Sequence, residues 1–262
     1  MEDYKNYYKC KRVLVTGGLG FIGSHLADML VGLEARVAIL HRRHNFRNIE
    51  HIKNRIDLYN VDLLNFEELK KNLHIIEPEI IFHLASPTNV VRDANLIDTN
   101  FDNIFTFTKN MVMVLNEMEF KAFINTGTCE EYGNGKVPFR EDQAPNPVSP
   151  YSAAKVASTY FCKMMNESFN SPIVNLRPFL TYGPRGTSLF VPSLIISSLE
   201  KKDFKMTKGE QTRDLIYVED VVDGYLRAGF FQDAVGEVIN IGSGKEYRII
   251  DTAIKIVELI KS

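Results

Sequence analysis

A phenol and an ammonium group stand four residues apart in the segment Tyr151-Ser-Ala-Ala-Lys155. Residues with this spacing lie on one face of a helix, where their side chains meet. A free phenol has a pKa of about 10 and is a poor base at neutral pH, but a neighbouring Lys⁺ stabilises the phenolate. Such a pair can exchange a proton with a hydroxyl or ketone of a substrate.

A hydroxyl group that can join this pair is that of Thr128, which closely follows the strand pattern 122–126. In an open parallel sheet, the carboxyl ends of the strands face the ligand crevice. Thr128 is therefore expected to hydrogen-bond the same substrate oxygen as Tyr151. The spacing Y-x-x-x-K alone is common on surface helices, so the placement of Thr128 is what favours a catalytic interpretation over a surface pair.

A glycine-rich turn lies near the start of the chain, between a strand pattern and a helix pattern. Residues 13–15 form an apolar run typical of a strand buried on both faces, and residues 24–30 have apolar positions at helical spacing. Between them stand Gly17, Gly20 and Gly23, which let the backbone approach a pyrophosphate at the helix N-terminus. This order predicts a dinucleotide site, and a glycine turn without a ligand is the alternative.

The next strand pattern, residues 36–40, runs into His41-Arg42-Arg43-His44. In an NAD site, an Asp or Glu usually follows this strand and binds the ribose 2′-hydroxyl. Arg42 and Arg43 stand here instead, and guanidinium groups suit the 2′-phosphate of NADP. The turn therefore favours NADP, with NAD as second choice, and a solvated basic loop is the alternative.

Strand and helix patterns alternate along the chain. Further strands are expected at residues 56–61, 80–84, 122–126, 173–177 and 237–241, and helices at 65–73, 94–118, 151–169 and 249–260. Alternation at this spacing predicts an α/β fold, a Rossmann-type doubly wound parallel sheet covered by helices on both faces.

The expected organisation is an NAD(P)-binding domain over residues 1–178 and a smaller C-terminal substrate-binding lobe over residues 179–262. The two parts are interleaved, because a strand near 237–241 is expected to return to the sheet. Residues 136–150 are rich in proline and predict a loop. Residues 1–10 are a polar, tyrosine-rich leader, expected to be loose up to the first strand.

The amino-acid composition limits the classes of partner that the chain is expected to bind. The 262 residues are 45% hydrophobic and 24% charged, with a formal net charge of −2, which gives no electrostatic reason to expect nucleic acid or an anionic membrane surface. No apolar run has the length of a membrane span, and the N-terminus lacks the apolar core of a signal peptide. The cysteines and histidines have no metal-ligand or disulfide spacing, and His83 fits a packed strand residue. A reduced, cytoplasmic protein without a metal is expected.

Several motifs stand in the order typical of one family, namely TGGLGFIG (16–23), HLAS (83–86), TGTCEEYG (126–133), YSAAK (151–155), LRPFLTYGPR (176–185), RDLIYVEDV (213–221) and NIGSG (240–244). The chain resembles the extended short-chain dehydrogenase/reductase family of nucleotide-sugar epimerases, dehydratases and reductases. The motifs cover nearly the whole chain, so the likeness is specific to the family and less so to one activity.

The resemblance implies roles for single residues. Thr128, Tyr151 and Lys155 form the implied catalytic triad. Arg213 is implied to reach the nucleotide of a nucleotide-activated sugar, and Thr88 and Thr128 are implied to contact this substrate. A homodimer through two long helices is usual in the family.

A larger set is implied to bind the cofactor. Within it, Asp62 and Leu63 are implied to meet the adenine, and Leu84, Ala85 and Asn100 to lie beside the cofactor. The full set is Gly17, Gly20, Phe21, Ile22, Gly23, Arg42, Arg43, Asp62, Leu63, Leu84, Ala85, Ser86, Asn100, Thr126, Tyr151, Lys155 and Pro178.

Two subgroups are similar by eye. The basic turn and the helix after it, residues 41–52, resemble GDP-mannose 4,6-dehydratases, whereas TCEEYG and the spacing over 244–249 resemble GDP-4-keto-6-deoxymannose reductases. The chain departs from the family at Leu180, where an Asn is usual, and at Cys129, where dehydratases with an Asp-Glu pair have Asp. The family also commonly continues beyond the position of Ser262, which raises the expectation of an incomplete nucleotide pocket.

Four activities remain open from the sequence. The favoured one is an NADP-dependent reductase of an NDP-4-keto-6-deoxyhexose, in which Tyr151 donates the proton and Thr128 orients the C4 oxygen. A 4,6-dehydratase would in addition use Glu130 as the base at C5, and a 4-epimerase would oxidise and re-reduce C4. Leu180 and the short C-terminus motivate the fourth, a catalytically inactive cofactor-binding protein.

Overall fold

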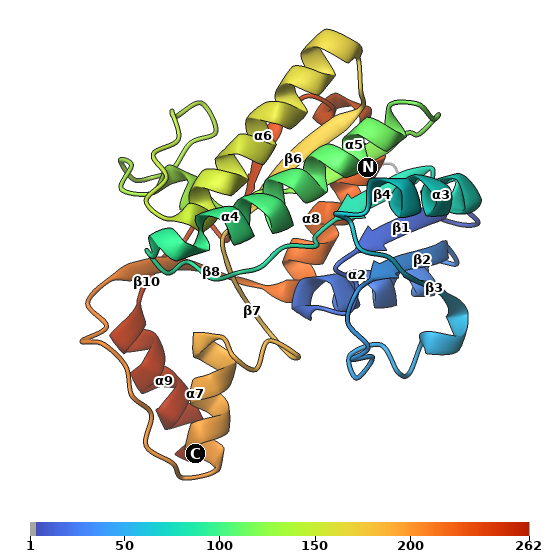
Figure 1. Ribbon diagram of the computed structural model, residues 1–262. Helices are drawn as coiled ribbons and strands as arrows, with labels where there is room; N and C mark the ends of the chain where they lie inside the picture. The colour runs from blue at the N-terminus through green and yellow to red at the C-terminus, as the bar shows by residue number, and fades with distance from the viewer. Residues whose placement is uncertain (1–3, 262) are drawn as a thin grey trace.

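A computed structural model describes residues 4–261, and at their centre lies a sheet of seven parallel strands in the order β3-β2-β1-β4-β5-β6-β9 (Figure 1). These strands are β1 (Arg12–Thr16), β2 (Arg36–His41), β3 (Ile56–Asn60), β4 (Ile80–His83), β5 (Ala122–Thr126), β6 (Ile173–Pro178) and β9 (Val238–Ile241). The apolar runs that predicted strands are these strands, and the Rossmann-type α/β fold is confirmed.

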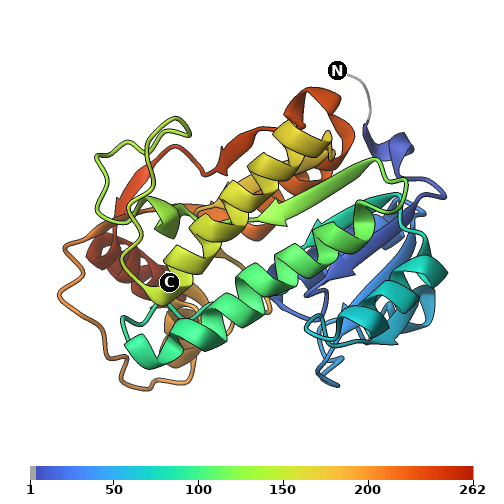
Figure 2. The ribbon, with the colours of Figure 1, turned by 45° about the horizontal axis from the view of Figure 1, so that its top comes forward.

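Helices cover both faces of this sheet because neighbouring strand residues point to opposite sides. Val13 and Val15 pack in one core with one group of helices, and Leu14 packs in a second core with the other group. The first group is α2 (Phe21–Gly32) and α8 (Val218–Phe230). The second is α3 (Phe66–Ile76), α5 (Phe107–Leu115) and α6 (Pro150–Phe169). Figure 2 shows α5 and α6 side by side across the sheet.

The strand order reverses beside β1. From β1 the chain adds β2 and then β3 on one side, whereas β4 pairs with the other side of β1. In doubly wound sheets, ligands bind outside the carboxyl ends of the strands at such a switch point. Here those ends are Thr16 of β1 and His83 of β4, which are paired in register.

The helix expected over 94–118 is not one regular helix. It consists of the 3₁₀ turn η2 (Ala94–Leu96), α4 (Ile97–Asn100), the π-helical η3 (Phe101–Thr106) and α5. The side chains of Asn100, Asn103 and Thr108 each donate to the carbonyl oxygen four residues earlier, at 2.7–2.9 Å. Such side-chain bonds compete with the backbone ladder, which accounts for the widened turns.

The expectation of a loose leader is wrong for its described part. Residues 4–7 form the short helix α1 (Tyr4–Tyr7), and the side chains of Tyr4 and Tyr8 are buried in the core on the α8 side of the sheet. The Tyr8 hydroxyl donates to the carbonyl oxygen of Leu226 at 2.5 Å. A Cβ at Gly229 would lie 2.5 Å from that hydroxyl, so glycine leaves the room that the tyrosine needs.

The remaining elements lie beside the main sheet, and the two helices among them are at the lower left of Figure 1. A three-stranded sheet has the order β10-β8-β7, and α7 packs against α9. The elements are β7 (Leu180–Tyr182), α7 (Phe190–Leu199), β8 (Thr212–Tyr217), β10 (Glu246–Arg248) and α9 (Ile249–Lys261). Among the described helices, none is long and apolar enough to cross a bilayer.

Candidate active site

The glycine turn joins β1 to α2 and packs against the segment that follows β4. Gly17 has a φ of +72°, and a Cβ there would lie 2.8 Å from the Ala85 nitrogen. A Cβ at Gly23 would lie 2.3 Å from the Gly17 carbonyl oxygen. Only glycine tolerates these contacts, so the turn brings its backbone against Leu84 and Ala85 at the switch point.

The N-terminus of α2 suits a phosphate group. Gly20 is its N-cap residue, and within the described chain no side chain caps this end. The first backbone N–H groups, at Phe21 and Ile22, are therefore presented together with the positive end of the helix dipole. This cradle fits the pyrophosphate of a dinucleotide.

Thr16 and His83 hold the switch point together. The Thr16 hydroxyl accepts a hydrogen bond from the Ala85 N–H at 3.2 Å and lies 2.8 Å from His83 Nδ1. Burial lowers the pKa of His83 to about 3, and the nearby Lys155 charge contributes. His83 is therefore a neutral packed residue. Among the residues that the structure describes, no group of His, Cys, Asp or Glu side chains could hold a metal ion.

Arg42 lies at the carboxyl end of β2 and contacts two neighbouring elements. Its guanidinium donates to Asn103 Oδ1 at 3.2 Å and lies 3.5 Å from Asp62 Oδ2, which follows β3. Arg43 is exposed, and its carbonyl oxygen lies 3.1 Å from His41 Nδ1. Asn103 was not among the expected residues, because its position depends on the π-helical turns, which apolar spacing does not show.

The other expected cofactor residues lie along the same edge. Leu84, Ala85 and Ser86 are half-buried in the irregular segment after β4, and Leu63 is buried after β3. Asn100 is buried, and within the described chain its Oδ1 atom has no hydrogen-bond partner. A buried acceptor without a donor is costly, so this atom fits a ligand group that donates to it.

Tyr151 and Lys155 lie on the first turns of α6, which begins after the N-cap residue Ser149. Both side chains are buried, and the Lys155 ammonium donates to the carbonyl oxygen of Thr126 at 2.6 Å. Burial lowers the pKa of Lys155 to about 8, and the charge of Glu131 opposes this shift. Burial raises the pKa of Tyr151, although a hydrogen bond with Thr128 acts in the opposite direction.

Thr128 is the N-cap residue of the 3₁₀ turn η4 (Cys129–Tyr132), which follows β5. Its hydroxyl accepts the Glu130 N–H at 3.2 Å, and its own N–H donates to Glu131 Oε1 at 3.0 Å. Thr128, Tyr151 and Lys155 thus come together at the carboxyl end of β5, where Pro178 ends the neighbouring β6. Glu131 was missed by the sequence analysis, although the spacing Thr128-x-x-Glu131 is that of a capping box.

Glu130 is half-buried in the same turn, and its charge raises the pKa of both Cys129 and Tyr151. Burial is the larger cause of the pKa of about 12 at Cys129, and the charge of Arg213 lowers it in part. Arg213, on β8, is therefore near this turn although its side chain is exposed. Thr88 is exposed in the irregular segment after β4.

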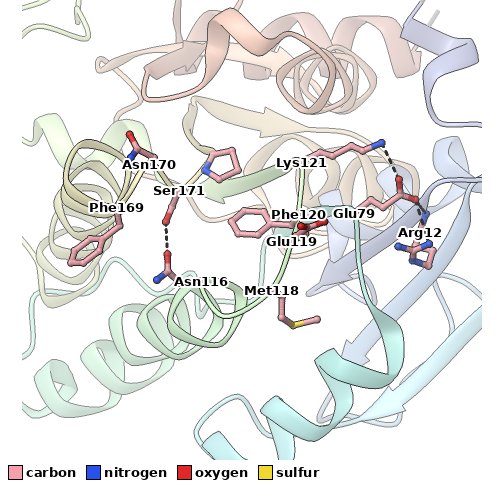
Figure 3. A pocket seen from close by; sticks show the side chains of 11 residues that line it. Arg12, Glu79, Asn116, Met118, Glu119, Phe120, Lys121, Phe169, Asn170 and Ser171 are labelled. Atoms are coloured by element: carbon pink, nitrogen blue, oxygen red, sulfur yellow. Dashed lines mark hydrogen bonds and ion pairs between the residues drawn. The ribbon is translucent and has the colours of Figure 1, made fainter.

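A hollow of about 590 Å³ lies elsewhere, and Figure 3 shows its lining. Arg12, Glu79, Lys121 and Ser171 stand at or just before the amino ends of β1, β4, β5 and β6. Glu79 forms ion pairs with Lys121 at 3.0 Å and with Arg12 at 3.9 Å. The hollow is thus at the edge of the sheet opposite to the candidate site.

Comparison with known proteins agrees with this geometry. Residues 13–242 match the NAD dependent epimerase/dehydratase family. The chain is 32% identical over 274 residues to a UDP-N-acetyl-alpha-D-glucosaminuronate decarboxylase of Bacillus cytotoxicus, covering 96% of this chain and 81% of that protein. It is 30% identical over 268 residues to the dTDP-D-glucose 4,6-dehydratase of Homo sapiens, covering 96% and 74%.

One solved structure is also similar to this chain in fold and sequence. The UDP-glucuronic acid 4-epimerase of Bacillus cereus, in complex with UDP-glucuronic acid and NAD, matches with a TM-score of 0.88 at 29% identity. The match covers 95% of this chain and 83% of that chain. The protein described here therefore belongs to the NAD-dependent epimerase/dehydratase family of extended short-chain dehydrogenase/reductase enzymes, whose members compared above act on nucleotide sugars.

Proposed function

We propose that this protein is an NADP-dependent oxidoreductase that acts at C4 of a nucleotide-activated hexose, as an NDP-4-keto-6-deoxyhexose reductase. The observation that carries the proposal is the buried group of Thr128, Tyr151 and Lys155 at the carboxyl end of β5. It lies at the same sheet edge as the glycine cradle, so a dinucleotide bound there would extend toward the phenol.

The protonation states of these groups suit reduction. NADPH, when bound, supplies the hydride. Because burial raises the pKa of Tyr151, its phenol is protonated at neutral pH and can donate its proton to the C4 oxygen. The Thr128 hydroxyl orients the same oxygen. Lys155, with a pKa of about 8, is mostly charged at neutral pH and stabilises the phenolate that remains.

Cys129, the residue before Glu130, argues against a 4,6-dehydratase. Elimination of water from the sugar needs a proton donor for the leaving hydroxyl and a base at C5. Dehydratases with an Asp-Glu pair have a carboxyl group at the position of Cys129. The Cys129 thiol, whose pKa burial raises to about 12, is a far weaker acid than the carboxyl group that such dehydratases have there. Glu130 alone supplies at most the base.

A 4-epimerase is the second candidate function. Oxidation and re-reduction of C4 need only Thr128, Tyr151 and Lys155, and a solved 4-epimerase has the same fold with a TM-score of 0.88. Arg42 and Arg43 favour the reductase, because guanidinium groups at the end of β2 suit the 2′-phosphate of NADPH. Reductive enzymes consume this cofactor, whereas an epimerase recovers its cofactor in each cycle.

The C-terminal elements, within the lobe proposed over residues 179–262, are the proposed binding region for the nucleotide of the substrate. A cavity of about 440 Å³ lies among β7, β8, β10 and α9, with Tyr182, Leu215 and Arg248 in its lining. Arg213 lies on β8, two residues before Leu215, and pairs with Tyr247 of β10, which also lines this cavity. Apolar walls with nearby guanidinium groups suit a base and a diphosphate.

A homodimer is also proposed, with a second copy of this chain as the partner. Helices α4, α5 and α6 lie side by side and cover one face of the main sheet (Figure 1). Large apolar side chains are exposed on these helices, namely Ile97, Met113, Tyr160, Met164 and Phe169. Two such surfaces would bury each other as a self-complementary interface. Light scattering on the purified protein tests this, and a monomer at micromolar concentration would contradict it.

The proposed reaction is tested by its redox stoichiometry. Purified protein is given NADPH and a panel of nucleotide sugars, including 4-keto-6-deoxyhexoses with different nucleotides, and products are identified by mass spectrometry. The reductase consumes one NADPH for each 4-keto sugar. In a parallel incubation with NADP⁺ in place of NADPH, conversion without net change in the amount of NADP⁺ would indicate a dehydratase, through loss of water, or an epimerase, through unchanged mass. NADP(H) binding without turnover of any sugar would indicate an inactive cofactor-binding protein.

A further inference from the structure

Glu131 is a fully buried carboxylate in η4, three residues after the proposed catalytic residue Thr128. Its Oε1 atom accepts the backbone N–H of Thr128 at 3.0 Å. A Cβ at the preceding Gly127 would lie 2.4 Å from this oxygen, so the glycine allows the carboxylate to approach the backbone. The contact fixes the backbone of Thr128, whose hydroxyl is proposed to orient the C4 oxygen of the substrate.

The other carboxylate oxygen, Oε2, connects the turn to two further elements. Arg177 of β6 contacts it through Nε at 2.9 Å and through its terminal nitrogen at 2.8 Å. The Thr159 hydroxyl of α6 donates to the same oxygen at 3.1 Å. Thr159 lies one turn after Lys155 and two turns after Tyr151, on the same face of α6. One carboxylate thus links the Thr128 turn to the helix that carries the other two catalytic residues.

The charges that face Glu131 come from several elements. Arg177 from β6 is ion-paired with it, and Tyr132 of η4 accepts from Arg177 at 2.9 Å. From α6, the charge of Glu131 acts on Tyr151, Lys155 and Cys162 and raises the pKa of each. For Lys155, the charge of Glu131 favours the charged form of the amine, whereas burial favours the neutral form.

We propose that Glu131 is a positioning residue, whose buried carboxylate fixes the Thr128 turn against α6 and places a negative charge near the Lys155 ammonium. It acts through Thr128 and Lys155, and the inference rests on the proposed function for the roles of these two residues. A purely structural ion pair with Arg177 would stabilise the fold without acting on Lys155.

Titration of Lys155 distinguishes a positioning role of Glu131 from a purely structural ion pair with Arg177, and it needs no substrate. The protein is labelled with ¹³C at the lysine ε-carbon, and the NMR signal of Lys155 is assigned by its loss in Lys155→Met. In the unchanged protein the midpoint is expected at about 8. Glu131→Gln keeps the shape of the side chain and removes its charge, so the midpoint should fall by about one pH unit or more.

Two further variants serve as controls, one for the loss of stability in Glu131→Gln and one for changes on α6 that leave Glu131 intact. Glu131→Gln leaves the buried Arg177 charge unpaired and destabilises the fold, whereas Glu131→Gln combined with Arg177→Met removes both charges. The midpoint should still fall in the double variant, but by less, because the Arg177 charge that is also removed acts on Lys155 in the opposite direction to Glu131. Ser158→Ala is the matched control, because Ser158 is buried beside Thr159 but donates to the Ala154 carbonyl oxygen at 3.0 Å. Its Lys155 midpoint should not move.

Turnover gives the second readout once a substrate is known. The Glu131 variants should lower kcat with little change in KM, because Glu131 does not touch the substrate. A Lys155 midpoint that stays at its original pH in both Glu131 variants would overturn the proposal, whatever their stability. A shifted midpoint in a protein that converts no nucleotide sugar would uphold the role of Glu131 and reject the proposed reaction.

Discussion

The Lys155 ammonium lies 2.6 Å from the carbonyl oxygen of Thr126, to which it donates a hydrogen bond. This contact joins the first turns of α6 to the last residue of β5. It holds Tyr151 beside Thr128, two residues beyond the end of that strand. The proposed catalytic group is therefore set by the packing of one helix on one strand end.

Tyr151→Phe tests the proton donor. The substitution keeps the ring in its buried position and removes the hydroxyl, so cofactor binding should persist while turnover falls by about 10²- to 10⁴-fold. Tyr160→Phe is the matched control, because Tyr160 lies on the exposed face of the same helix. Near-normal turnover in Tyr151→Phe, measured on a verified substrate, would show that another group donates the proton.

Arg42 and Arg43 are expected to give NADP(H) a higher affinity than NAD(H). Each charge-assisted contact with a phosphate is worth about 1.5–3 kcal/mol, so replacing both arginines by alanine should reduce the preference by about 10²-fold or more. Calorimetric titration with both cofactors measures this. Arg47→Ala, an exposed change on the same loop, is the control. Equal affinities in the unchanged protein would contradict the expectation.

Glu130→Gln separates a reductase from a dehydratase. A reductase needs one hydride and one proton, which NADPH and Tyr151 provide, so the variant should lose less than about tenfold in turnover, below the range for loss of a general base. Exposed Glu210→Gln serves as the control. Complete loss of product in Glu130→Gln, with water eliminated by the unchanged protein, would identify a dehydratase.

His83 is expected to make the fold sensitive to acid. Burial lowers its pKa from 6.5 to about 3, so between these values the unfolded chain binds more protons than the folded one. The contribution of His83 to the free energy of unfolding is therefore present above pH 6.5 and is lost as the pH falls toward 3. Between pH 7 and pH 4 the unchanged protein should lose about 3 kcal/mol relative to His83→Asn.

Urea unfolding at both pH values measures this difference. His74→Asn is the control, because His74 lies at the end of α3 and its ring nitrogen bonds only to the Lys70 carbonyl oxygen among the described contacts, at 2.8 Å. If the unchanged protein and His83→Asn lose the same stability over this range, His83 is not buried in its neutral form.

Much of the fold could be predicted because its signals are local. Residues 13–15 and 80–82 lie in strands buried on both faces, and such strands show as unbroken apolar runs. Asn65 was expected to open a helix, and its side chain does accept the backbone N–H of Glu68 at 3.3 Å. The spacing of Tyr151 and Lys155 likewise placed both residues on one helix face.

What could not be predicted depends on contacts between distant segments. Tyr8 is buried because Gly229, far along the chain, leaves room for its hydroxyl. Glu131 is buried because Arg177, on the neighbouring strand, neutralises its charge. The segment around Tyr8 is polar and the turn that contains Glu131 is acidic, so neither has a local sequence pattern that predicts burial. The π-helical turns that bring Asn103 to Arg42 similarly arise from side-chain bonds within an apparently regular helix pattern.

In the proposed reaction, hydride from NADPH reaches C4 of a nucleotide-activated 4-keto-6-deoxyhexose, and Tyr151 supplies the proton. The most direct test uses NADPH that carries deuterium at its transferable position, with product analysis by NMR. We expect one deuterium at C4 of the sugar for each NADPH consumed, and labelled product from Tyr151→Phe should form about 10²- to 10⁴-fold more slowly. Product without deuterium at C4, formed while the amount of NADPH stays constant, would contradict it.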